Sequence, residues 1–93
     1  MKGAAIYAPH GDLVVATVLK AKEAIKALIA DSDGDLTIDF GDVEMIDSKG
    51  LGLLIATCNS LSAEGRRLRI TRASADIVEL FQTMRLDKHF VLE

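Results

Sequence analysis

The sequence of 93 residues is poor in cysteine, proline and aromatic side chains. Its one cysteine, Cys58, excludes an internal disulfide, and a lone thiol is typical of the reducing cytoplasm. The longest apolar run, residues 51–58, is interrupted by Gly52 and is much shorter than the roughly 20 residues that span a bilayer. The N-terminus also lacks the apolar stretch of a signal peptide. These absences predict a soluble, cytoplasmic domain without membrane insertion.

The sequence also has few positive charges. It contains 11 lysines and arginines and 14 aspartates and glutamates, which gives a formal net charge of −3. A surface of this sign does not attract a phosphate backbone, so we expect no nucleic-acid partner. One basic cluster stands out, and we interpret it as a solvated strand edge with its turn: Arg66, Arg67, Arg69 and Arg72. The length fits one domain spanning residues 1–93, and the 49% of apolar residues provide its core.

Apolar spacing predicts strands that alternate with helices. Short or alternating apolar segments predict strands at 4–8, 36–40 and 68–71, with a last short strand around 90–92. This order is typical of an α/β fold, a small and mostly parallel sheet of three or four strands with about three helices packed mainly on one face.

Helical spacing gives the three helices between these strands. The first is expected over 15–30 and capped by Thr17 or started earlier by Asp12, the second runs through residue 61 and stops at Gly65, and the third begins at the N-cap Ser74. Their inward faces are predicted to include Leu19, Ile55 and Met84.

The most informative segment is 45–54, which follows a strand and opens the second helix. Either Asp47 or Ser48 is placed to cap that helix. A serine there is exposed, and the helix dipole favours a phosphate, which adds about −1.5 to −2 charges. Gly50 and Gly52 remove side chains from the first turn, which indicates tight packing or a partner that approaches closely.

This segment resembles the Asp-Ser-Ser-Gly-Leu-Gly signature of the STAS domain family, which this chain matches with Asp47-Ser48-Lys49-Gly50-Leu51-Gly52. The family includes the anti-sigma factor antagonists of bacteria. The similarity extends to Gly11-Asp12-Leu13, which resembles the family's Gly-Glu-Leu-Asp turn, and to segments 36–40, 65–70 and 77–86. It therefore covers nearly the whole chain in order. Lys49 replaces the second signature serine, Val14 replaces the last aspartate of the turn, and the chain starts about one strand late.

The resemblance implies a phosphorylation switch. In the family, the unmodified protein binds a serine kinase that is also an anti-sigma factor, and phosphorylation of the first serine after the aspartate breaks the complex. That serine is Ser48 here, and the residues expected to bind the partner are Asp12, Asp47, Ser48, Lys49, Gly50 and Gly52. We expect a monomer or weak dimer that is not an enzyme and needs no cofactor or metal.

Other interpretations stay open at this point. Ser48 and Asp47 each fit a plain cap, and Lys49 fits a solvated first-turn lysine. The chain also fits a non-catalytic STAS subunit of a transport ATPase, chemotaxis or stress-signalling complex without a phosphoryl cycle. An enzyme that uses Ser48 or Cys58 is disfavoured, because no base lies at a recognisable spacing and His10 or His89 would have to converge on the thiol.

Overall fold

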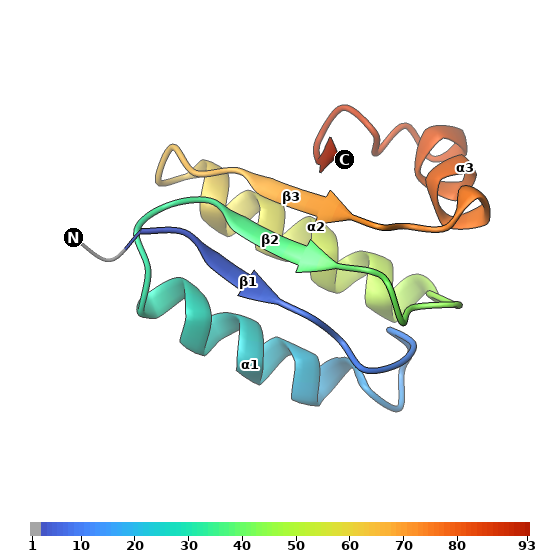
Figure 1. The fold of residues 1–93 in the computed structure, drawn as a ribbon, viewed down its shortest axis with the longest axis horizontal. Helices are drawn as coiled ribbons and strands as arrows, with labels where there is room; N and C mark the ends of the chain where they lie inside the picture. Colours follow the sequence, from blue (N-terminus) through green and yellow to red (C-terminus); the bar gives the residue numbers. More distant parts are fainter. Residues whose placement is uncertain (1–2) are drawn as a thin grey trace.

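The computed structural model describes residues 3–93, in which three helices alternate with four strands (Figure 1). The sheet has the order β1-β2-β3-β4, and all three strand pairs are parallel. The predicted parallel sheet is therefore confirmed, including its last strand. In chain order the elements are β1 (Ala5–Tyr7), α1 (Val18–Ala30), β2 (Leu36–Asp39), α2 (Ser48–Ser62), β3 (Leu68–Thr71), α3 (Ala75–Thr83) and β4 (Val91–Leu92).

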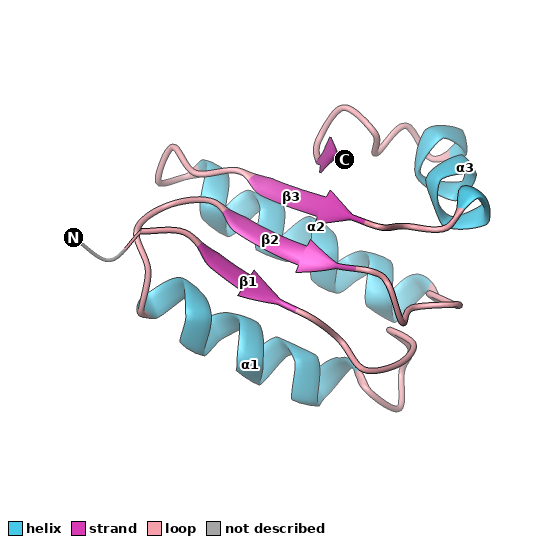
Figure 2. Cartoon of the chain, in the orientation of Figure 1, coloured by secondary structure: helices cyan, strands magenta, loops and turns pink. Residues whose placement is uncertain are grey.

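The helices α1 and α2 run along one face of the sheet, and α3 lies beyond the carboxyl end of β3 (Figure 2). Each strand is joined to the next by one helical crossover, and right-handed crossovers that advance in one direction keep their helices on one face. The strands alternate accordingly. In β2 and β3 the buried residues are Leu36, Ile38, Leu68 and Ile70, whereas the residues between them are only half-buried.

All three phenylalanines join in one aromatic contact at the carboxyl end of the sheet. The ring of Phe81, in α3, meets Phe40 and Phe90 edge-on, with ring centroids 6.2 and 5.4 Å apart. Edge-to-face pairs of this kind stabilise a fold beyond their burial alone. The contact fixes α3 against the end of β2 and the segment before β4.

Three residues predicted to face inward are exposed instead. Leu19 is 71% exposed, because the buried stripe of α1 is narrow and runs through Ala21 and Ile25. Ile55 lies at the solvent edge of α2, and Met84 follows the last residue of α3. The apolar faces are thus narrower than the sequence pattern suggests.

The first helix begins at Val18, three residues later than predicted. A turn precedes it, in which the Thr17 N–H donates to the Val14 carbonyl at 2.9 Å. The Thr17 hydroxyl accepts from the Val14 N–H and donates to the Asp12 carbonyl, so it closes this turn and does not cap the helix.

The interpretation of the basic cluster as a solvated edge is wrong for Arg66, which is only 8% exposed. Its Nε donates to the Gly34 carbonyl at 2.7 Å, and its two terminal nitrogens bind the Ile29 carbonyl, Glu64 and the Ser32 hydroxyl. One side chain therefore holds the turn between α1 and β2 against the turn between α2 and β3.

Two more arginines of the cluster are paired on the open face of the sheet. Arg69 binds the carboxylates of Asp35 and Glu93, and Arg72 binds both oxygens of Asp39 at 2.8 Å. Two of the four arginines of the cluster therefore form ion pairs across the sheet.

Candidate functional site

The loops that follow β1 and β2 lie side by side at the carboxyl edge of the sheet. They form one isolated parallel bridge between Leu13 and Ile46. The Leu13 N–H donates to the Met45 carbonyl at 3.1 Å, and the Asp47 N–H donates to the Leu13 carbonyl at 3.2 Å. Ligand and partner sites of open parallel sheets commonly lie at this edge.

Two carboxylates hold the loops together, each from its own loop to the other. Asp12 Oδ1 accepts the N–H groups of Glu44 and Met45, both at 3.0 Å. Asp47 Oδ2 accepts the N–H of Val15 at 2.9 Å. We call this reciprocal pair of contacts, made by Asp12 and Asp47, the aspartate brace. It holds the site in one arrangement.

Asp47 is also the N-cap of α2, because its Oδ1 accepts the N–H groups of Lys49 and Gly50 at 3.0 Å each. The hydrogen bonds from Gly50 and then from Val15 lower the pKa of this carboxyl the most, and the Lys49 hydrogen bond lowers it further. Desolvation, which is weaker than the first two, opposes them. Of the two candidate caps, the structure therefore selects Asp47.

Ser48 is the first residue of α2, and its side chain is exposed. Within residues 3–93 its hydroxyl has no hydrogen-bond partner. The interpretation of Ser48 as a plain helix cap is thereby excluded. Lys49 and Gly52 are exposed beside it on the same end of the helix. The free hydroxyl of Ser48 thus lies next to the two loops that the aspartate brace holds together.

Gly50 differs from the other residues predicted to bind a partner, because it is buried. A Cβ at this position would overlap the Leu13 carbonyl oxygen and lie 2.7 Å from Cγ1 of Ile46. Close packing of α2 on the loop of Leu13 therefore explains this glycine. Gly52 has nothing within 4 Å of the same position and faces solvent.

The two loops also carry exposed apolar side chains, which the sequence pattern does not reveal. Val15 is 65% exposed and Met45 is 61% exposed, although both are held by the aspartate brace through their main chains. Leu19 follows Val15 by one helical turn. The loop pair thus displays apolar surface close to Ser48.

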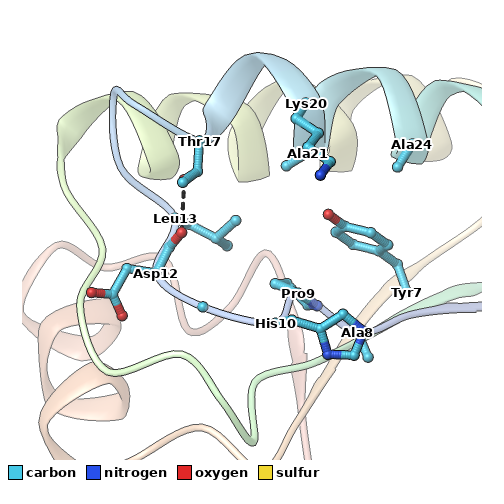
Figure 3. Close-up of a pocket in the computed structure, with 11 residues that line it drawn as sticks. Tyr7, Ala8, Pro9, His10, Asp12, Leu13, Thr17, Lys20, Ala21 and Ala24 are labelled. Atoms are coloured by element: carbon cyan, nitrogen blue, oxygen red, sulfur yellow. Dashed lines mark hydrogen bonds between the residues drawn. The ribbon is translucent and has the colours of Figure 1, made fainter.

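A hollow of about 560 Å³ adjoins the same loops, between the end of β1 and α1 (Figure 3). Small side chains, Ala21 and Ala24, leave this space, and Tyr7 and Lys20 stand beside it. Partial burial raises the pKa of the Tyr7 hydroxyl. The surface next to the two loops is therefore concave on the side of α1.

The residues that a Cys-His enzyme requires do not converge. The buried Cys58 donates its S–H to the main-chain carbonyl of His89 at 3.1 Å, and not to an imidazole. His10 lies 3.8 Å from Asp42 at the surface. Over residues 3–93 no three His, Cys, Asp or Glu side chains are grouped as a metal site requires. In the same range no helix has the length and apolarity to cross a bilayer.

The profile of the STAS domain matches residues 1–93. The chain belongs to the STAS domain family. An anti-sigma-B factor antagonist of Staphylococcus aureus is 32% identical over 72 residues, which are 77% of this chain and 67% of that protein. The anti-sigma-F factor antagonist RsfB of Mycobacterium tuberculosis is 30% identical over 89 residues, 90% of this chain and 73% of that protein.

Solved structures of STAS proteins share the fold. SpoIIAA in its unphosphorylated form superposes with a TM-score of 0.77 at 18% identity, over 100% of this chain and 81% of that one. The phosphorylated form of Bacillus SpoIIAA gives 0.75 at 19% identity, over 100% and 85%. A sulfate transporter family protein from Wolinella succinogenes gives 0.78 at 17% identity, over 97% and 76%. At these identities the likeness concerns the fold.

Proposed function

We propose that this protein is an anti-sigma factor antagonist that works in the cytoplasm by binding and not by catalysis. Its partner is a serine kinase that also acts as an anti-sigma factor, and phosphorylation of Ser48 ends the complex. The observation that carries the proposal is the exposed, unbonded hydroxyl of Ser48 at the start of α2. The names of the relatives that are 30–32% identical support it.

The surroundings of Ser48 suit a switch of this kind. The N–H groups of Lys49 and Gly50 are already bound by Asp47, so a phosphate on Ser48 stays at the surface. The helix dipole still favours its charge, and the fold tolerates it. The partner meets about −1.5 to −2 added charges beside the Asp47 carboxylate. Asp12 contributes indirectly through the brace, and Lys49 and Gly52 lie in the contact surface.

The exposed apolar residues supply the remaining contact. The main chains of Val15 and Met45 are held on the two sides of the bridge between the loops, so little backbone entropy is lost when a partner covers their side chains. Burial of apolar side chains beside a charge-sensitive centre gives a complex that is stable until the charge changes. A role as a subunit of a transport ATPase rests only on the shared fold and is not favoured.

The first test is binding to the candidate kinase from the same genome, measured by calorimetry. Ser48→Ala is expected to bind like the wild type, whereas Ser48→Asp is expected to lose about tenfold or more in affinity because it adds charge at the contact. Ser60→Asp is the matched control, because Ser60 is an exposed serine near the other end of α2. Equal affinities of Ser48→Asp and Ser48→Ala would contradict the proposal.

The second test is phosphorylation itself. The protein is incubated with each candidate serine kinase from its genome and ATP, and the modified residue is mapped by mass spectrometry. We expect a single phosphate on Ser48 and none on Ser48→Ala. Modification of other serines alone, or stable co-purification with an ATPase without any phosphate, would overturn the switch.

A further inference from the structure

The fourth arginine of the basic cluster, Arg67, differs from the other three. Its main-chain N–H donates to Asp35 Oδ1 at 2.9 Å, but its exposed guanidinium has no hydrogen bond or ion pair with any of residues 3–93. Its positive charge reaches Asp35 only as a weak contribution to the lowered pKa of that carboxyl. The Asp35 carboxylate is already bound by Arg69.

Arg67 opens onto a hollow of about 290 Å³ between the end of α2, the start of β3 and the segment before β4. The other charged or polar side chains that line it include Ser62, Arg66, Lys88 and His89. None of the nine lining residues is an aspartate or a glutamate. Glu64, which does not line the hollow, is paired with Arg66, so the charges left for a ligand are those of Arg67 and Lys88.

We propose that this hollow is a binding site for a phosphate group, either free phosphate or the phosphate of a small monoester. The planar guanidinium of Arg67 is suited to bidentate contact with phosphate oxygens, and the Lys88 ammonium provides a second full charge. His89 and the Ser62 hydroxyl supply further N–H and O–H donors. Arg67 and Lys88 together carry two positive charges, which match a phosphate dianion.

Arg66 also lines the hollow. Its guanidinium is bound by the carbonyls of Gly34 and Ile29, by the Ser32 hydroxyl and by the Glu64 carboxylate, so its charge is already paired. A liquid water occupies about 30 Å³, so the space admits a phosphate with several waters.

The site is independent of the proposed switch. Ser62 is the last residue of α2 and Ser48 the first. A helix rises 1.5 Å per residue, which separates the two ends by about 20 Å. A phosphate in the hollow therefore does not occupy the surface around Ser48, and the Ser48→Ala variant is expected to bind phosphate like the wild type.

The test is a titration with inorganic phosphate at constant ionic strength, with chloride as the balancing anion, followed by amide chemical shifts. We expect saturable shifts, confined to residues 62–68 and 88–91, with a dissociation constant in the millimolar range or below, about 1 mM. A parallel titration with O-phosphoserine distinguishes the two sources. Equal affinity supports free phosphate as the ligand, and tighter binding supports a monoester.

Matched variants make the result specific. Arg67→Gln and Lys88→Gln are each expected to weaken binding about tenfold, because each removes a charge-assisted hydrogen bond. Lys22→Gln removes the same charge from an exposed position on α1 that does not line the hollow, and it is expected to bind like the wild type. Shifts that do not saturate by about 20 mM, or equal weakening in all three variants, would overturn the proposal.

Discussion

Neighbouring residues at the start of α2 have opposite tasks. The Asp47 carboxylate accepts three hydrogen bonds from the main chain of two segments, whereas the Ser48 hydroxyl next to it has none. Gly50 faces inward and Gly52 outward, two residues apart. At the scale of single residues, the site thus combines a hydroxyl without a partner, on Ser48, with a carboxylate whose hydrogen bonds hold the main chain around it, on Asp47.

The two glycines give a matched prediction. Gly50→Ala is expected to lower the free energy of unfolding by about 1–3 kcal/mol, because its methyl would overlap the Leu13 carbonyl oxygen. Gly52→Ala is expected to raise it by about 0.5–1 kcal/mol, because alanine is the better helix former and meets nothing there. Urea unfolding of both variants measures the difference. A Gly50→Ala variant as stable as Gly52→Ala would show that the loop of Leu13 moves to accommodate the added methyl group.

At the scale of elements, the two ends of the sheet are secured by different means. The carboxyl edge, which carries the site, is held by the aspartate brace between two loops. The opposite edge is held by Arg66, whose buried guanidinium joins the turn before β2 to the turn before β3. Both devices use side chains to satisfy main-chain groups that the strands leave unpaired.

Replacement of Arg66 tests the second device. Arg66→Met keeps much of the volume but leaves the carbonyls of Gly34 and Ile29 without their donor, so we expect a loss of about 2–4 kcal/mol in the free energy of unfolding. Arg67→Met, one residue along, is expected to change it by less than about 0.5 kcal/mol, because no partner is lost. Chemical denaturation of both variants measures the free energy of unfolding. Equal losses in Arg66→Met and Arg67→Met would contradict the assigned role of Arg66.

The elements and their order could be predicted from the sequence, because apolar periodicity and the turn residues report them directly. Strand 68–71 has its predicted bounds, and the α2 start was located by its signature. Long-range contacts could not be predicted. Asp12 reaches Glu44 and Arg66 reaches Gly34 across more than 30 residues, and nothing in the local pattern marks either partner. For the same reason, the sequence leaves open whether Gly50 serves packing or a partner, and its contact with the loop of Leu13 decides for packing.

At the scale of the whole molecule, stability is expected to fall in acid. The Arg67 N–H lowers the pKa of Asp35, the Arg72 side chain that of Asp39, and the Gly50 N–H that of Asp47. The unfolded chain, with an aspartate pKa of about 3.9, therefore takes up protons before the folded chain does. The contribution of these groups is complete above that value and is lost as the pH falls through the lower folded pKa values.

Urea midpoints measured from pH 7 down to pH 3 test this expectation. We expect little change from these carboxyls between about pH 7 and pH 5 and a decline below about pH 4. Asp47→Asn is the informative variant, since it removes one of the three groups. Its midpoint is expected to be lower at pH 7 and to decline less in acid. A wild-type midpoint that stays constant down to pH 3 would contradict the assigned contacts.

The strand order β1-β2-β3-β4 also affects how the chain is made. Ala5 pairs with Leu36, Leu36 with Leu68, and Arg69 with Val91, so β2, β3 and β4 each pair with the strand synthesised just before them. During translation, each new strand leaves the ribosome when its template is already in place. The sheet is able to grow from its first strand outward, and no early strand has to wait for the end of the chain.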